Sequence, residues 1–155
     1  MIQIDLRNPD GSDDAAIAHL IYDAIHQGRS LYTAEERQAW MPAPHSGEAW
    51  SKRLAAQRVF LARNGKRVIG AMTLKGDYID LAYVAPARQG QGLFRRLFEL
   101  LETEARRAGI RRLTTHASLM AQPAFLAVGF RVIRHEKIAQ SGQMLARAEM
   151  EKDPL

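Results

Sequence analysis

The stretch Val84-Ala-Pro-Ala-Arg-Gln-Gly-Gln-Gly-Leu-Phe94 lies where one structural pattern gives way to another. Before it, Tyr78–Val84 has the composition of a short strand, and after it, 90–108 carries leucines at helical spacing. Gly90 and Gly92 in a strand-to-helix turn let backbone N–H groups approach an anion closely, and the helix N-terminus favours negative charge. The stretch therefore predicts a phosphate or pyrophosphate site, with a tight structural turn as the alternative.

Two common nucleotide motifs do not fit this turn. Arg95 stands where the dinucleotide fingerprint would place its third glycine, and no Gly-Lys-Ser or Gly-Lys-Thr follows for a triphosphate loop. We therefore expect the turn to bind the phosphate groups of a ligand that neither of these two motifs recognises.

Working outward, the neighbouring patterns predict a mixed sheet. Residues 58–63 and 66–74 alternate as strands around Asn64-Gly65, a strong signal for a two-residue hairpin turn. The predicted strand 112–116 follows the helix and Gly109, and a strand, helix and strand in succession imply one parallel crossover at the glycine turn.

The two ends of the chain complete an α/β pattern. The N-terminal third predicts a strand and three helices, and the C-terminal part predicts a short helix and a hairpin. In chain order these are a strand at 2–6, a helix capped by Ser12 and ending at Gly28, a helix with a capping box at Thr33, a helix starting at Ser46, a helix over 121–128, and strands over 130–138 and 143–151. We expect one three-layer α/β domain over residues 1–155, with a mostly antiparallel sheet of six to seven strands flanked by helices.

Composition narrows the class of protein. Of 155 residues, 46% are hydrophobic and 25% are charged, which is enough apolar surface for a core and argues against disorder. The absence of cysteine excludes disulfides, thiolate metal sites and a cysteine nucleophile. No leader pattern or long apolar run is visible, so we expect a cytoplasmic protein without membrane association.

The net charge of +5 comes mainly from arginine, and seven arginines fall between positions 88 and 112. Such a stretch fits an anionic partner, and it equally fits a solvated helix face with internal ion pairs. Binding of nucleic acid is disfavoured, because the stretch has no aromatic platform apart from Phe94 and Phe98, which lie at apolar helix positions.

At the glycine turn the sequence resembles the GNAT N-acetyltransferases. Their acetyl-CoA signature, Gln/Arg-x-x-Gly-x-Gly/Ala preceded by Val-x-Pro, is matched by Val84-Ala-Pro86 and by 89–94, with Phe94 in place of the last small residue. A second pattern of the family, Asn-x-x-Ala-x-x-x-Tyr-x-x-x-Gly-Phe, is represented at the family's spacing by Ser118, Ala121, Phe125, Gly129 and Phe130. The order of the predicted helices and strands along the whole chain also resembles that of the family.

The resemblance implies direct transfer of an acetyl group from acetyl-CoA to an amine, with acetyl-CoA as cosubstrate. His19, His26, His45 and His135 are too scattered along the sequence for a metal site, so we expect no metal. It implies that the cofactor lies against Ala82, Tyr83, Val84, Gln89, Gly90, Gln91, Gly92, Leu93, Phe94 and Ser118. Arg88, Arg95 and Arg96 are near enough in sequence to strengthen capture of an anionic cofactor. We expect a backbone N–H near Val84 to stabilise the charge that develops on the thioester oxygen.

The groups that move protons are less clear from the sequence. Histone-type members use a Glu as base where this chain has Tyr78, so we consider Asp80, on the same strand face, as the first candidate and a structural partner of an arginine as its alternative role. His116 is a second candidate, as base or relay. Phe125 replaces the tyrosine that reprotonates the leaving thiolate, which leaves Tyr83, Ser118 or water for that step.

The acceptor should be recognised by the N-terminal helices, where Tyr22, Tyr32, Trp40 and Trp50 are available to line a pocket. An aromatic lining with few acids favours a small-molecule or amino-acid-like amine. A peptide or protein amine, and a non-catalytic acyl-CoA-binding or sensing module, stay open as alternatives. Either a monomer or a homodimer is compatible with the sequence.

Overall fold

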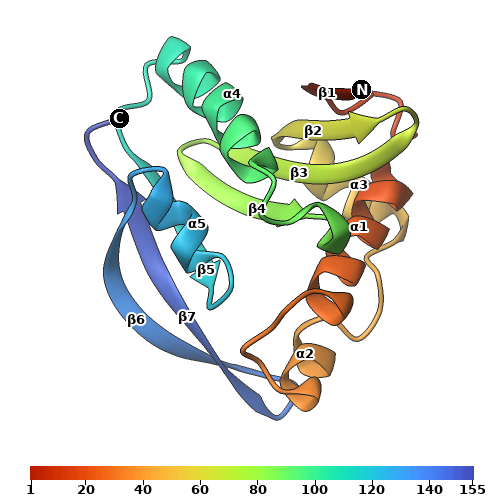
Figure 1. The fold of residues 1–155 in the computed structure, drawn as a ribbon, viewed down its shortest axis with the longest axis vertical. Coiled ribbons are helices and arrows are strands. Elements are labelled where there is room, and N and C mark those ends of the chain that lie inside the picture. The colour runs from red at the N-terminus through yellow and green to blue at the C-terminus, as the bar shows by residue number, and fades with distance from the viewer.

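A computed structural model describes all residues from 1 to 155 and is built on one seven-stranded sheet (Figure 1). The strand order is β1-β2-β3-β4-β5-β7-β6, and only β4 and β5 pair in parallel. The strands are β1 (Ile2–Leu6), β2 (Arg58–Asn64), β3 (Arg67–Lys75), β4 (Tyr78–Val84), β5 (Leu113–Ser118), β6 (Arg131–Gln140) and β7 (Gln143–Lys152). The predicted mixed, mostly antiparallel sheet with one crossover is confirmed.

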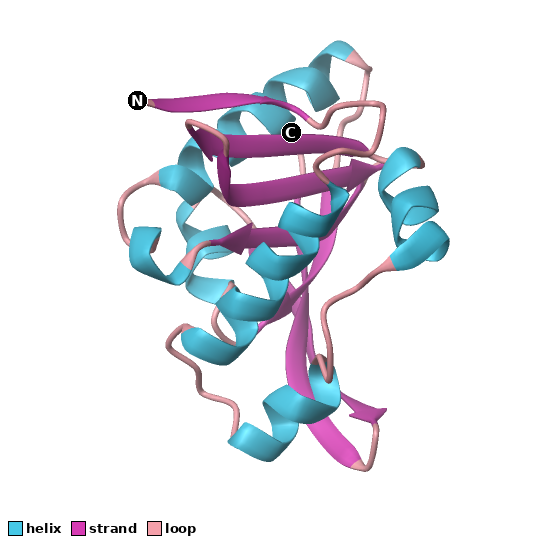
Figure 2. Cartoon of the chain, turned by 90° about the vertical axis from the view of Figure 1, so that its right-hand side faces the viewer, coloured by secondary structure: helices cyan, strands magenta, loops and turns pink.

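Helices cover both faces of the sheet, which gives three layers (Figures 1 and 2). One core packs α4 and α5 against the strands, and the other packs α1 and α3 against the opposite face of β2, β3 and β4. The helices are α1 (Asp14–Gln27), α2 (Ala34–Trp40), α3 (Gly47–Ala55), α4 (Leu93–Arg107) and α5 (Gln122–Ala127), with a short 3₁₀ turn at Pro86–Arg88. No helix is both long and apolar enough to span a membrane.

The feature that positions the site is the separation of β4 from β5. The two strands pair only at Tyr78 with Thr114 and at Ile79 with Thr115, and beyond these pairs they diverge. A register shift between β3 and β4 inserts one extra residue into β4, so that Asp80 and Leu81 interrupt the alternation of the strand. The remainder of β4 therefore presents a free edge toward β5.

The β6–β7 hairpin turns steeply away from the direction of β1–β4 and reaches α2 (Figure 2). Two hydrogen bonds fix it there: Gln140 Nε2 donates to Trp40 O at 3.1 Å, and Tyr32 Oη donates to Ala146 O at 2.5 Å. The hairpin and α2 thereby close one side of the opening between β4 and β5.

Three local predictions need correction. The helix predicted from Gly90 begins at Leu93, because Gly90 and Gly92 adopt left-handed backbone angles, φ 76° and 83°, that end regular structure. Ser12 does not cap α1, which begins at Asp14 after Asp13. The strand predicted to end at 116 continues to Ser118 because it pairs with β7 over that whole length.

Candidate active site

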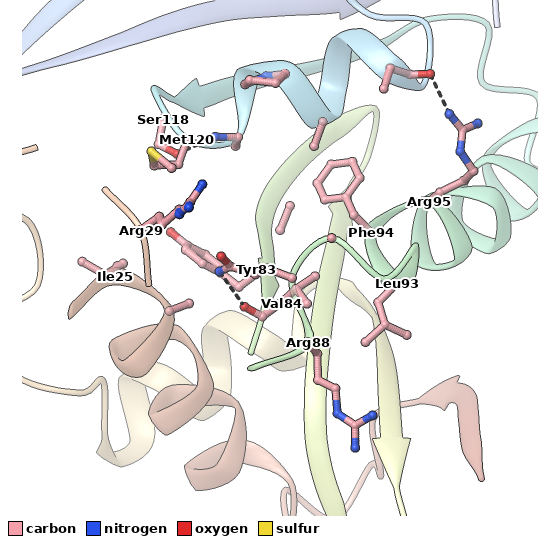
Figure 3. Close-up of a pocket in the computed structure, with 18 of the residues that line it drawn as sticks. Ile25, Arg29, Tyr83, Val84, Arg88, Leu93, Phe94, Arg95, Ser118 and Met120 are labelled. Carbon is pink, nitrogen blue, oxygen red and sulfur yellow. Dashed lines mark hydrogen bonds between the residues drawn. The ribbon is translucent and has the colours of Figure 1, made fainter. Parts of the chain in front are cut away.

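Two neighbouring cavities form the candidate site, and the first of them, around the glycine turn, has a volume of about 400 Å³ (Figure 3). We call it the glycine-loop cavity. Its walls come from the end of α1, the second half of β4, the β4–α4 turn and α5 with the loop before it. The lining includes Ala24, Ile25, Arg29, Ser30, Trp40, Ala82, Tyr83, Val84, Arg88, Gln89, Gly90, Gly92, Leu93, Phe94, Arg95, Ser118, Met120, Ala121, Pro123, Ala124, Ala127 and Val128.

The glycine turn offers unpaired N–H groups to this cavity. Gly92 is the N-cap of α4, and Arg96 N is the first to donate to a carbonyl of the turn, at 3.1 Å from Gly92 O. The N–H groups ahead of it have no carbonyl within the helix. A Cβ built on Gly90 or Gly92 meets nothing within 4 Å, so glycine is required there by φ and leaves open space for a guest.

The free edge of β4 faces the same cavity. Ala85 N donates to Ile69 O of β3 at 2.8 Å, so the alternation of an antiparallel strand turns the N–H groups of Ala82 and Val84 the other way, toward β5. β5 pairs with none of these residues. Gln89 Nε2 reaches back to Val84 O at 3.3 Å, which holds the turn against the strand (Figure 3).

Two aromatic residues depart from the family signature, and the structure separates their positions. Phe94 is half-buried and lines the glycine-loop cavity without filling it. Phe125 is 1% exposed and lies in the core behind the cavity wall, edge-on to Phe94 and Phe130 with centroid distances of 5.0 Å to each. Phe125 therefore faces apolar side chains rather than a reacting group.

The three arginines that we expected near the cofactor also differ in position. Arg88 and Arg95 line the glycine-loop cavity, whereas Arg96 does not. Arg95 Nη2 donates to Ala127 O at 2.9 Å and so ties α4 to the end of α5 (Figure 3). Arg29, which the sequence analysis did not single out, comes from the residues after α1 and points into the cavity (Figure 3).

The second cavity, of about 300 Å³, lies between α2, α3, the first half of β4, β5 and the β6–β7 hairpin. We call it the polar cavity. Its lining is Tyr32, Trp40, Met41, His45, Arg53, Tyr78, Asp80, Leu81, Tyr83, His116, Ser118, Ile138, Gln140, Leu145, Ala146 and Arg147. Of the four aromatic residues predicted to line a pocket, Tyr32 and Trp40 do so here, while Trp50 is buried in the core and Tyr22 packs beside it.

Asp80 and Tyr78 lie on the same wall of the polar cavity, as predicted. The Asp80 carboxylate accepts two hydrogen bonds from Arg53, from Nε and Nη2 at 3.0 Å each, and a third from Gln57 Nε2 at 2.7 Å. Three donors occupy this carboxylate, which favours the structural role over proton transfer.

The two cavities meet at Tyr83, Ser118 and Trp40, which line both. Burial raises the pKa of the Tyr83 hydroxyl well above its usual range, so Tyr83 is protonated at neutral pH. Ser118 Oγ accepts from Ala121 N at 3.2 Å and stabilises the turn before α5. It does not cap that helix, whose N-cap is Ala121.

His116 lies on the wall that β5 contributes to the polar cavity. Its Nδ1 is 2.8 Å from Tyr78 Oη, and its Nε2 is 3.6 Å from Glu136 Oε1 and 3.7 Å from Glu149 Oε2. The sequence analysis missed Glu136, Glu149, Arg53 and Arg147 as neighbours of the candidate residues. No spacing in the sequence links them, because Glu136, Glu149 and Arg147 come from β6 and β7 and Arg53 comes from α3, all far along the chain from the residues they contact.

The glycine-loop cavity fits acetyl-CoA in shape and in chemistry. The open turn and the α4 N-terminus suit a pyrophosphate, and the apolar lining from Ala82 to Val128 suits a pantetheine arm. No group of three or more metal-ligating side chains is present that could hold a metal ion.

Comparison with known families agrees with this site. The family model described as "Acetyltransferase (GNAT) domain" matches residues 17–152. The chain belongs to the GNAT acetyltransferase family, and its enzyme class is N-acetyltransferase.

Individual relatives are similar over nearly the full length. The chain is 24% identical over 156 residues to the uncharacterized N-acetyltransferase YafP of Escherichia coli, with 99% of both chains covered. It is 27% identical to a GCN5-related N-acetyltransferase from Rhodopseudomonas palustris, with a TM-score of 0.86 over 97% of this chain and 94% of that one. The PaiA N-acetyltransferase of Thermoplasma acidophilum, solved with coenzyme A, shares the fold at 16% identity and a TM-score of 0.73, with 99% of both chains covered.

Proposed function

We propose that this enzyme transfers an acetyl group from acetyl-CoA directly to the primary amine of a small amphipathic or amino-acid-like molecule. The observation that carries the proposal is the meeting of two cavities at Tyr83 and Ser118, beside the free edge of β4. One cavity suits an anionic cofactor with a long apolar arm, and the other suits the acceptor.

The backbone holds the cofactor in this proposal. The N–H groups of 90–95 bind the pyrophosphate at the N-terminus of α4, where the helix dipole adds to them. Ala82, Tyr83, Val84 and Ser118 lie along the pantetheine arm, and Leu93 and Phe94 support it. Arg29, Arg88 and Arg95 add positive charge around the entrance.

The free edge of β4 stabilises the reacting thioester. The N–H groups of Ala82 and Val84 point into the opening and have no strand partner there, so one of them is available to the oxygen on which negative charge develops. A preorganised donor of this kind lowers the barrier without reorganisation at the moment of reaction.

Tyr83 is the proposed general acid for the leaving thiolate. It lies at the junction of the cavities, and because burial raises its pKa the hydroxyl carries its proton at neutral pH. Phe125 supplies no proton, both because it lacks a hydroxyl and because it lies in the core. Proton removal from the amine falls to Asp80 or His116, and the hydrogen bonds around Asp80 favour His116.

The size and lining of the polar cavity favour a small acceptor. Its volume of about 300 Å³ is closed on one side by the contact of the hairpin with α2, where Gln140 bonds to Trp40. The walls mix aromatic rings with charged groups, which suits an amine carried on a short apolar or aromatic body. A long peptide has no open groove here, so we place a peptide or protein amine second.

The test is thiol release from acetyl-CoA with a panel of acceptors at neutral pH. The panel holds aliphatic and aromatic primary amines, free amino acids and a lysine peptide. We expect turnover with at least one small amine and little with the peptide. Binding of acetyl-CoA without turnover of any amine would contradict the proposal and support the acyl-CoA-sensing alternative. The same preparation, run by light scattering, distinguishes the proposed monomer or homodimer.

A further inference from the structure

A chain of polar groups crosses the boundary between β4 and β5 on the wall of the polar cavity. It begins at the Tyr78 hydroxyl, which lies 2.8 Å from His116 Nδ1, and it ends at Glu136 and Glu149, whose carboxylates are 3.6 Å and 3.7 Å from His116 Nε2. Tyr78 belongs to the first of the two paired positions of β4 and β5, one residue before the last pair, Ile79 with Thr115. The chain therefore leads from the opening into the sheet.

The surroundings of His116 decide which nitrogen carries its proton. Two carboxylates face Nε2, and an ionised carboxylate can only accept a hydrogen bond. Arg147 Nε donates to Glu136 at 2.8 Å, and this contact lowers the pKa of the Glu136 carboxyl, which is ionised at neutral pH. These two carboxylates, 3.6 Å and 3.7 Å away, favour hydrogen on Nε2, which leaves Nδ1 with a lone pair that accepts from the Tyr78 hydroxyl.

The Tyr78 hydroxyl is suited to pass a proton rather than to hold a charge. Burial raises the pKa of Tyr78, so it is a neutral donor to His116 at neutral pH. Its oxygen keeps a lone pair, and its ring lines the polar cavity. A hydroxyl that donates to one neighbour and accepts from another can transfer a proton without becoming a phenolate.

We propose that Tyr78 and His116 form a proton relay that deprotonates the acceptor amine, a role that rests on the proposed acetyl transfer. The ammonium gives one proton to Tyr78 Oη as Tyr78 gives its own proton to His116 Nδ1. The resulting imidazolium is stabilised by Glu136 and Glu149, and it loses its extra proton to solvent. The amine nitrogen then forms its bond to the acetyl carbon as the carbon–sulfur bond breaks. Tyr83 protonates the departing thiolate, and the second proton of the amine returns Tyr83 to its neutral form.

The other charged groups near the relay leave this route open. Arg134 lies 3.5 Å from Glu136 and 3.8 Å from Glu149, and with Arg147 it offsets the two carboxylates, so the imidazolium is stabilised without being held permanently. Asp80, which lies on β4 with Tyr78, is occupied by Arg53 and Gln57. The remaining imidazole of the cavity, His45, stacks on Trp50 at 4.5 Å, and burial lowers its pKa.

The first test needs no acceptor. Two-dimensional ¹H–¹⁵N NMR of the imidazole groups in the full chain reports the tautomer of each histidine at pH 7.5 to 8. We expect His116 with hydrogen on Nε2 and a free, hydrogen-bonded Nδ1. A neutral His116 with hydrogen on Nδ1 could not receive the proton of Tyr78, and this result would overturn the relay whatever the enzyme acetylates.

The second test follows kcat against pH with an accepted amine. Tyr78→Phe and His116→Asn should each lower kcat at pH 7 by about 100-fold or more, within the usual contribution of a general base. The loss should shrink as the pH rises past the pKa of the free ammonium, because the amine then arrives unprotonated. The control is His135→Asn, an exposed histidine on β6, which should retain wild-type kcat.

Two outcomes separate this relay from the wider proposal. Tyr78→Phe should keep the stabilisation of the fold by acetyl-CoA in a thermal-shift titration, because Tyr78 lines only the polar cavity. Wild-type kcat in Tyr78→Phe at pH 7, or a loss of equal size at every pH, would overturn the relay while leaving the acetyl transfer intact. Failure of the wild-type enzyme to acetylate any amine would overturn the transferase proposal instead. The NMR measurement of the His116 tautomer would then still test the hydrogen bond between Tyr78 and His116.

Discussion

The two cavities of this enzyme are built in different ways. The glycine-loop cavity depends on the backbone of one short segment, in which Gly90 and Gly92 hold left-handed angles and α4 begins with unpaired N–H groups. The polar cavity depends on side chains from both helical and strand segments, with partners as far apart as Arg53 and Asp80 or His116 and Glu149. One site is thus a property of local sequence, and the other is a property of the assembled sheet.

This difference indicates how each site should respond to change. The glycine-loop cavity binds mainly through its backbone, so substitutions of Gly90 or Gly92 should impair it, whereas substitutions of other lining side chains should have smaller effects. A side-chain-built site should lose function stepwise, because each group has a separate partner.

Gly92→Val should abolish tight binding of acetyl-CoA. A branched side chain at φ 83° is strained and projects into the space that the pyrophosphate would take. We expect the dissociation constant to rise at least about 100-fold, roughly 2.8 kcal/mol. Isothermal titration calorimetry measures it.

Gly142→Val is the matched control for that variant. Gly142 has φ 81° in the β6–β7 turn, also with nothing within 4 Å of a built Cβ, and it is remote from the glycine-loop cavity. Both variants should lose similar stability, but only Gly92→Val should lose acetyl-CoA. Equal binding in the two variants would show that the turn does not hold the cofactor.

Tyr83→Phe should separate chemistry from cofactor binding. Removal of the hydroxyl at the junction of the cavities should lower kcat by about 100-fold, the lower end of general-acid contributions, while acetyl-CoA binds as before. Tyr22→Phe, outside both cavities, is the control. Unchanged kcat in Tyr83→Phe would assign reprotonation of the thiolate to water or to Ser118.

Phe125→Tyr should destabilise the fold without improving catalysis. The added hydroxyl enters a core of Phe94 and Phe130 with no polar partner, which costs about 2 kcal/mol. Urea unfolding gives the stability, and thiol release gives kcat. A higher kcat with unchanged stability would show that position 125 reaches the thiolate after all.

Asp14→Asn should alter stability and its pH dependence while leaving both cavities unaffected. Two hydrogen bonds from Arg7, at 2.6 Å and 2.9 Å, hold the pKa of Asp14 below its usual value of 3.8. A carboxyl with a lowered folded-state pKa stabilises the fold above about pH 4 and loses this contribution as the pH falls further.

The variant should therefore lose about 2 kcal/mol at pH 7 and show a weaker loss of stability below pH 4. Thermal melts from pH 3 to 7 measure this, with acetyl-CoA binding as the internal reference. Acid sensitivity identical to that of the wild type would contradict the role given to the Arg7–Asp14 pair.

Asp80→Asn should give the smallest effect. The pair with Arg53 is partly exposed, at 39% and 20% for the two side chains, so its loss should lower the free energy of unfolding by about 1 kcal/mol. We expect kcat to fall less than tenfold at pH 7. Glu48→Gln, in an exposed pair with Lys52, is the control. A loss of 100-fold or more that recovers at high pH would make Asp80 the base and remove that role from His116.

The sequence predicted the fold and the glycine-loop cavity well for a physical reason. The capping box at Thr33 and the glycine turn are local signals, and each forms as expected. The hairpin predicted around Asn64-Gly65 also forms, but its two turn residues are Gly65 and Lys66, because Asn64 pairs with Arg67 as the last residue of β2. The exact start of α4 was missed because helical periodicity continues through Gly92, whereas the backbone conformation does not.

The polar cavity was predictable only in part. Asp80 and His116 were identified as candidates, but their partners were not, since Arg53 reaches Asp80 from α3, and Glu136 and Glu149 reach His116 from β6 and β7. The proposed role of Tyr78 was missed because a tyrosine in place of the family's catalytic Glu does not by itself indicate a part in proton transfer. Its importance depends on a neighbour 38 residues away.

The most direct test of this account is a map of amide NMR shifts on titration with acetyl-CoA. The account predicts shifts at Val84, Gly90 and 92–95, around the glycine-loop cavity, with Arg53, Glu136 and Arg147 nearly unchanged. Shifts confined to the polar cavity, or no shifts at millimolar acetyl-CoA, would contradict the assignment of cofactor binding to the glycine-loop cavity.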